Sequence, residues 1–70
     1  MPKIREVRRY LIRHGWVKYR ETDHEYYRLL MPDGTYRYTR ISHGDGEIPP
    51  PVWRLQLKQI GITQEEFNQE

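Results

Sequence analysis

Histidine is the side chain best suited to move a proton near neutral pH, and this sequence has three of them. His24 is expected to open a strand. Because side chains alternate along a strand, it then shares a face with Tyr26 and Arg28. Such a face would offer an acid or base, a stacking ring and a phosphate contact. The sequence leaves open the alternative that His24 is an ordinary exposed strand residue.

The other two histidines are expected in different settings. His43 lies in a glycine-containing loop, and it is a second candidate for proton transfer if this loop folds toward the sheet. A solvated loop residue is the alternative. His14 sits at the end of a predicted helix, where a cation suits the helix dipole, so we expect a structural role for it.

Other reaction chemistry has little support in the sequence. The chain has no cysteine, which excludes disulfides and thiolate metal sites, and His24 and His43 do not have the spacing of a zinc motif. We therefore predict no metal and no cofactor. The glycine-containing run 44–46 is too short for a phosphate-binding loop. Ser42 is the only serine, and its adjacency to His43 says little about geometry.

The basic residues are concentrated at one end of the chain. The net charge is +2, but residues 1–20 carry seven Lys and Arg against one acid, and residues 21–70 carry five against nine. The first segment is therefore +6 and the second −4, an asymmetry that favours an anionic partner. An exposed helical stripe is predicted where arginine recurs every fourth residue, at Arg5, Arg9 and Arg13. An ordinary solvated face is the alternative.

Tyrosines are interleaved with arginines in two predicted strands. The two runs are Tyr26-Tyr27-Arg28 and Tyr36-Arg37-Tyr38. This pattern suits single-stranded RNA, whose bases can stack on aromatic rings. Cross-strand packing of tyrosines, which is common in small sheets, explains the pattern equally well.

The length of 70 residues fits a single domain, residues 1–70, with one modest core. Charged residues make up 31% of the chain, but aromatic residues make up 13%, so the composition is not that of a disordered protein. The longest apolar run, 29–31, is too short for a membrane span or a signal peptide. We therefore expect no membrane partner and a cytoplasmic location.

Hydrophobic spacing predicts that the chain begins with a helix over residues 4–13. Its apolar positions are Ile4, Val7, Leu11 and Ile12. Three strands are expected next, over residues 16–20, 24–30 and 35–41. The sequence Met-Pro-Asp-Gly at 31–34 predicts a tight turn between the last two strands, because proline sets the first central position and glycine accepts positive φ.

Two further helices are expected near the C-terminus. Pro51 suits the first turn of one helix, which ends at Gly61 and buries Trp53, Leu57 and Ile60. Thr63 and Glu66 form a capping box that starts a last short helix, to about residue 68. Short connections imply an antiparallel sheet, and both larger helices must cover one of its faces. The predicted fold is an α+β two-layer sandwich.

The order of these features resembles that of the HicA family, the toxins of bacterial and archaeal toxin–antitoxin pairs. The resemblance spans about residues 4–67. It is carried by His14-Gly15-Trp16 at the helix end, His24 at the second strand, the Pro32-Asp33-Gly34 turn, and Ile48-Pro49-Pro50 before a helix ending in Gly61-Ile62. It implies a double-stranded-RNA-binding-domain-like α-β-β-β-α fold. It also implies a metal-independent mRNA endoribonuclease (an interferase) that blocks translation, and a HicB-like antitoxin that covers the active site.

In that family the catalytic histidine ends a Gly-Ser-His motif, and the matching residues here are Thr22-Asp23-His24. The resemblance therefore assigns to His24 the role of general acid or base toward RNA. Loss of the glycine changes how closely the backbone can approach a phosphate. Asp23 adds a negative charge that repels the RNA backbone. These departures bear on the strength of catalysis more than on the fold, and an attenuated or inactive relative is the alternative.

Four arginines are assigned to RNA from the residues themselves and not from the family motif. Arg28 is expected to contact a phosphate. The stripe of Arg5, Arg9 and Arg13 is expected to dock RNA electrostatically. Two other functions stay open: a non-catalytic RNA-binding module of the same fold, and an interaction protein whose basic face docks an acidic partner.

Overall fold

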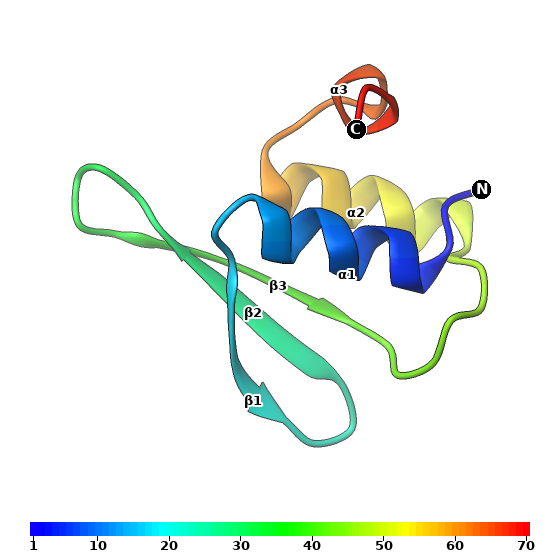
Figure 1. Cartoon of the computed structure of the whole chain (residues 1–70), viewed down its shortest axis with the longest axis horizontal. Helices are drawn as coiled ribbons and strands as arrows, with labels where there is room; N and C mark the ends of the chain where they lie inside the picture. The colour runs from blue at the N-terminus through cyan, green and yellow to red at the C-terminus, as the bar shows by residue number, and fades with distance from the viewer.

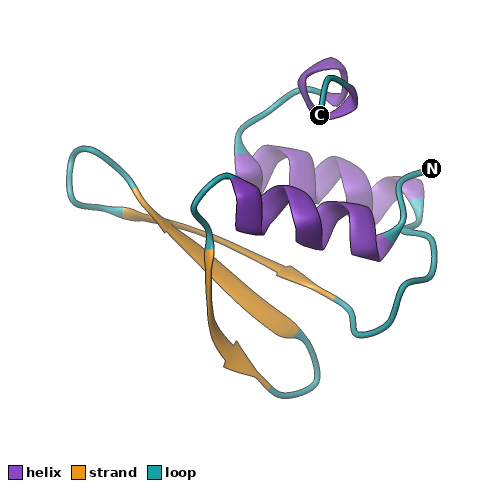
Figure 2. Cartoon of the chain, in the orientation of Figure 1, coloured by secondary structure: helices purple, strands orange, loops and turns teal.

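The computed structural model describes all 70 residues as three helices and a three-stranded sheet (Figure 1). The elements are α1 (Ile4–Arg13), β1 (Val17–Glu21), β2 (Glu25–Leu30), β3 (Tyr36–Ile41), α2 (Pro50–Ile60) and α3 (Gln64–Asn68). The strands are antiparallel in the order β1-β2-β3, and the helices all lie on one side of the sheet (Figure 2). The predicted α-β-β-β-α order, the antiparallel sheet and the short C-terminal helix are confirmed.

The turn between β2 and β3 has the predicted conformation. Gly34 has φ +89°, and its N–H donates to the Met31 carbonyl oxygen at 2.9 Å. The Met31 N–H in turn donates to the Thr35 carbonyl oxygen at 2.8 Å, which closes the hairpin. Figure 1 shows that this end of the hairpin extends beyond the helices. The turn sets the register of the two strands, in which Leu30 pairs with Tyr36 and Tyr26 with Arg40.

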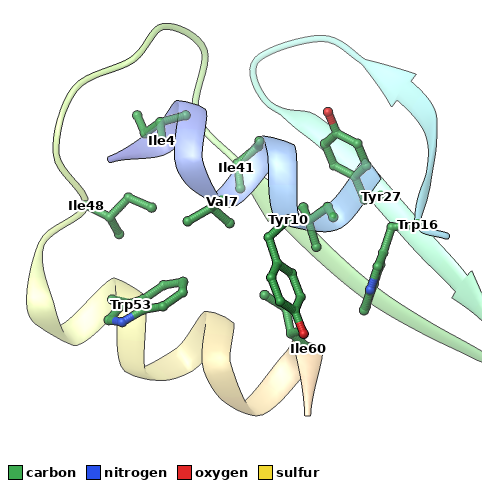
Figure 3. Close-up of a cluster of buried hydrophobic side chains, with 10 residues drawn as sticks. Ile4, Val7, Tyr10, Trp16, Tyr27, Ile41, Ile48, Trp53 and Ile60 are labelled. Atoms are coloured by element: carbon green, nitrogen blue, oxygen red, sulfur yellow. The ribbon is translucent and has the colours of Figure 1, made fainter. Parts of the chain in front are cut away.

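The core lies between the helices and the sheet (Figure 3). It is formed by Ile4, Val7, Tyr10, Leu11, Trp16, Tyr27, Ile41, Ile48, Trp53 and Ile60. The predicted burial of Leu11, Trp53 and Ile60 is confirmed, and Leu57 packs against the cluster while partly buried. None of the helices combines the length and the apolar character needed to cross a membrane.

One predicted apolar position of α1 is wrong. Ile12 is 61% exposed, whereas Tyr10, which the spacing did not single out, is buried. The 3.6-residue period explains the difference, because Ile12 is turned by about 100° from Leu11, toward Arg5 and Arg9. Tyr10 lies on the other side of the helix from Ile12 and packs on Phe67 of α3, with the ring centroids 5.4 Å apart.

The helix ends have the predicted caps. Gly61 ends α2 with φ +85°, and Thr63 caps α3 by accepting a hydrogen bond from the Glu66 N–H at 3.1 Å. His14 is the C-cap residue of α1; its ring stacks on Tyr10 at 4.1 Å, and its Nε2 lies 2.6 Å from Oε1 of Glu70. The predicted position of His14 at the end of α1 is therefore confirmed.

Candidate active site

His24 lies in the tight turn that joins β1 to β2, immediately before the first residue of β2. The Thr22 N–H donates to the His24 carbonyl oxygen at 3.0 Å. The Asp23 carboxylate accepts hydrogen bonds from the Thr22 hydroxyl and from the Tyr26 hydroxyl, both at 2.9 Å. These contacts fix the backbone of the turn and the position of the carboxylate beside the imidazole.

The His24 ring presents only part of itself to solvent. Its Nδ1 is shielded and lies 3.2 Å from Oδ2 of Asp23, although the two atoms do not form a hydrogen bond. The side chain as a whole is 30% exposed. Because Nδ1 does not contribute to that exposure, Nε2 is the ring nitrogen that remains for contact with a ligand.

Asp23 is ionised at neutral pH. Hydrogen bonds from Thr22 and then Tyr26, together with the contact to His24, hold the pKa of this carboxyl well below its usual range. The negative charge of Asp23 that the sequence predicts beside His24 is therefore present, and the hydroxyl groups of Thr22 and Tyr26 hold the carboxylate in position.

A shallow hollow of about 220 Å³ opens beside His24, and we refer to it as the His24 hollow. The sheet and the following loop contribute Arg40 and Ser42 to its lining. The α2 helix contributes Val52, Leu55, Gln56 and Gln59. The hollow therefore combines a proton-transfer group, a cation, a hydroxyl and two amides.

Gln56 contributes a buried acceptor without a partner to the lining of the His24 hollow. This side chain is 5% exposed; its Nε2 donates to the Arg40 carbonyl oxygen at 3.1 Å, and its Oε1 has no partner. Only two shielded side-chain polar atoms of the chain lack a hydrogen bond, His24 Nδ1 and Gln56 Oε1, and both belong to residues that line this hollow. An unpaired buried acceptor is costly unless a ligand or water satisfies it.

The sequence did not predict that Arg40, Ser42 and Gln56 would line this hollow. Arg40 could have been found by counting outward from the turn at 31–34, because the hairpin register sets it opposite Tyr26 on the face that also carries His24. No local signal could have identified Gln56, since it reaches the hollow only through the packing of α2 on β3.

Arg28 lies on the predicted face, together with Tyr26, but it does not line the His24 hollow. Its guanidinium lies over the rings of Tyr19 and Tyr36, at 5.3 and 4.6 Å from their centroids. Arg40, and not Arg28, is therefore the arginine that the fold brings to the hollow.

The predicted arginine stripe lies on a different surface. Arg5, Arg9 and Arg13 are exposed on α1, opposite the buried residues that pack on the sheet. Arg9 and Arg13 line a groove between α1 and α3 that also contains acidic residues. The structure therefore does not bring the stripe together with His24.

The loop that carries His43 does fold toward the sheet. His43 Nε2 lies 2.9 Å from the Thr22 carbonyl oxygen, and Nδ1 lies 3.6 Å from Oε2 of Glu25. This histidine therefore meets the turn that holds His24, but it is not part of the lining of the His24 hollow.

Glu25 is the centre of a partly buried polar group that we call the Glu25 cluster: Glu25, Arg8, Tyr27 and His43. Arg8 donates to both carboxylate oxygens, at 3.0 and 3.1 Å, and Tyr27 donates its hydroxyl at 2.9 Å. Arg8 also donates to the Gly44 carbonyl oxygen at 3.0 Å. The cluster thus ties α1 to β2 and to the loop that contacts the His24 turn.

Tyr27 makes the stability of the protein sensitive to alkaline pH. Burial, and then the Glu25 carboxylate, raise the pKa of Tyr27 to about 12 from 10. A raised pKa in the folded state stabilises the fold fully below pH 10, and this contribution is lost as the pH rises toward 12. We expect wild type to lose about 2 kcal/mol relative to Tyr27→Phe over this range, as urea unfolding measures.

Tyr36→Phe, at an exposed tyrosine, is the matched control and should follow wild type. If the free energy of unfolding falls with pH in the same way in wild type and in Tyr27→Phe, the ionisation of Tyr27 does not affect stability.

No model of a known protein family matches this chain, and no curated protein matches it either. The chain has no group of three or more His, Asp or Glu side chains arranged to hold a metal ion.

Proposed function

We propose that this chain is an endoribonuclease that cuts mRNA without a metal ion, with His24 as its general acid or base. The observation that carries the proposal is the His24 hollow. There, a partly exposed imidazole, a cation and an unpaired buried acceptor face the same small space. These are the groups that a phosphodiester and its 2′-hydroxyl would engage.

The reaction uses a nucleophile that RNA supplies. The 2′-oxygen attacks the adjacent phosphorus, the bond between phosphorus and the 5′-oxygen breaks, and a 2′,3′-cyclic phosphate and a 5′-hydroxyl result. His24 takes the proton from the 2′-hydroxyl or gives one to the leaving 5′-oxygen, and water completes the other transfer. Arg40 would stabilise the charge that develops on the phosphorus oxygens, while the unpaired Gln56 oxygen would accept a hydrogen bond from the sugar or base.

The biological role that fits this reaction is that of a toxin that blocks translation, as the resemblance to the HicA family implies. A toxin of this kind requires a neutralising protein, here a HicB-like antitoxin. Val52 and Leu55 support such a partner, since they are exposed apolar side chains at the rim of the His24 hollow. A protein seated on them would close the hollow to RNA.

A non-catalytic RNA-binding module is the second candidate. The sheet face that carries Tyr26 and Arg28 favours it, because rings and cations on a strand surface can hold RNA without cutting it. The replacement of Gly-Ser by Thr22-Asp23 before the histidine also favours it.

Product chemistry separates the two candidates. The purified chain is expected to cut single-stranded RNA into fragments that end in 2′,3′-cyclic phosphate and begin with 5′-hydroxyl, as mass spectrometry would show. EDTA should leave the rate unchanged, and an all-2′-deoxy strand should stay intact because it lacks the nucleophile. Intact RNA after long incubation would favour the binding module, and loss of cutting in EDTA would contradict the metal-free mechanism.

A further inference from the structure

The side of the sheet that faces away from the helices carries four tyrosines, and we refer to it as the tyrosine face. The rings come from all three strands and lie side by side. Ring centroids are 6.4 Å apart for Tyr19 and Tyr26, 6.0 Å for Tyr19 and Tyr38, and 6.2 Å for Tyr36 and Tyr38. A β-bulge between Lys18 and Arg20 interrupts the register of β1 at Tyr19, and such bulges re-aim side chains.

Three arginines accompany the rings. Arg28 lies over Tyr19 and Tyr36, Arg20 lies 5.4 Å from the ring centroid of Tyr26, and Arg40 pairs with Tyr26 across the strands. The strands contain only two acidic residues, Glu21 and Glu25. These pair with each other in the register, and Glu25 is buried toward α1. The tyrosine face therefore carries three positive charges, and the Asp23 carboxylate, which accepts a hydrogen bond from the Tyr26 hydroxyl at 2.9 Å, places one negative charge at its end.

Nothing in the chain covers this face. All three helices lie on the other side of the sheet (Figure 2), and Tyr19, Tyr36 and Tyr38 are 43, 40 and 53% exposed. Aromatic rings exposed in a group mark an interaction surface more often than rings scattered singly. The tyrosines pack on one another through their ring edges and faces, but part of their outer surface remains exposed to solvent.

The tyrosine face is continuous with the His24 hollow. A second, smaller hollow of about 140 Å³ is lined by Tyr19, Tyr26, Tyr38, Thr39, Arg40 and Gln59. The two hollows share Arg40 and Gln59. A chain-like ligand that enters the His24 hollow can therefore pass over Arg40 and reach the tyrosine rings without leaving the surface.

We propose that the tyrosine face is a stacking track for unpaired nucleotides of an RNA strand whose neighbouring phosphate lies at His24. The proposal rests on the proposed function for the identity of the strand as RNA. Rings stack on any base, and arginines pair with phosphates, so the track binds without sequence preference. Duplex RNA does not fit, because its paired bases are unavailable for stacking. An acidic protein is disfavoured, because carboxylates would engage the arginines but leave the rings unused.

Binding can be measured apart from cleavage with a fluorescent all-2′-deoxy single strand, because stacking needs no 2′-hydroxyl. Replacement of Tyr38 by threonine keeps a good strand former and removes the ring. We expect Tyr38→Thr to bind about tenfold more weakly in fluorescence anisotropy. Tyr36→Thr should behave in the same way, and Tyr38→Phe, which keeps the ring, should recover most of the affinity that Tyr38→Thr loses.

Charge variants test the arginines. Arg28→Gln should reduce the slope of log affinity against log salt concentration by about 0.7, the value for one phosphate contact with a single strand. Arg54→Gln removes the same charge from an exposed position on α2 that lines neither hollow, and it should leave the slope unchanged. Thermal melting of each variant would confirm that it is folded.

The outcomes separate this proposal from the proposed function. Wild-type affinity in folded Tyr36→Thr and Tyr38→Thr would overturn the track, even if the chain cuts RNA. Tyrosine-dependent binding in a chain that cuts nothing would support the track and reject the nuclease. Duplex RNA or a polyglutamate peptide should compete with the fluorescent strand more weakly than an unlabelled single strand does. If either competitor displaces the fluorescent strand at the same concentration as the unlabelled single strand, the track is overturned.

Discussion

His24→Ala is expected to lower the rate of RNA cleavage by about a hundredfold to ten-thousandfold, the usual contribution of a general acid or base. The fold should be unaffected, because the His24 side chain is partly exposed, its Nδ1 has no hydrogen-bond partner, and the Asp23 carboxylate keeps its bonds from Thr22 and Tyr26. Single-turnover cleavage of a labelled RNA measures the rate, and thermal melting checks the fold. Expression of the variant should no longer arrest growth.

Two other histidines serve as controls for this experiment. His14→Gln should cut RNA at the wild-type rate, because His14 packs on Tyr10 and Glu70 at the end of α1. His43→Gln tests the second candidate while keeping a donor for the Thr22 carbonyl oxygen. If His43→Gln is inactive and His24→Ala is as active as wild type, the general acid or base is His43.

Most of the fold could be predicted from sequence because its signals are local. The turn at 31–34, Gly61 after α2 and the Thr63 capping box each specify their own backbone conformation within four residues. The error at Ile12 has a different origin. The helical period places Leu11 with Ile4 and Val7 on one side of α1 and turns Ile12 about 100° away, so strict use of the period would have excluded Ile12 from the core.

Only the part of the candidate site that depends on the alternation of side chains along a strand could be predicted. The period of two correctly placed Tyr26 and Arg28 on the face away from the helices. The placement of Arg40 needed the hairpin register as well, which the turn supplied. The His24 hollow needed α2 to pack on β3, and the Glu25 cluster needed three separate segments to meet. Such long-range contacts leave no pattern in a single sequence.

Glu25→Ala is expected to lower the free energy of unfolding by about 3 kcal/mol, the low end for breaking a buried ion pair. The loss leaves the buried Tyr27 hydroxyl without an acceptor and Arg8 without its carboxylate. The low end applies because the Arg8 side chain is 27% exposed and retains some hydration. A domain of this size has roughly 4–10 kcal/mol in total, so urea unfolding should show the effect clearly.

Glu21→Ala is the matched control, because Glu21 lies opposite Glu25 in the sheet but is exposed. It should cost less than about 1 kcal/mol. An equal loss in the two variants would show that the Glu25 cluster contributes no more than a surface carboxylate does.

The pH dependence of stability in wild type and in a further variant, Glu25→Gln, tests whether the charge of Glu25 is the cause. Burial alone would raise the pKa of Glu25, but hydrogen bonds from Arg8 and Tyr27 outweigh it and lower this pKa below its usual value of 4.5. A lowered pKa in the folded state stabilises the fold above pH 4.5, and this contribution is lost as the pH falls through the lowered value. Wild type should therefore exceed Glu25→Gln in stability at pH 7, and the difference should vanish in acid. A constant difference between the two proteins at all pH values would mean that the shape of the side chain, and not its charge, holds the cluster together.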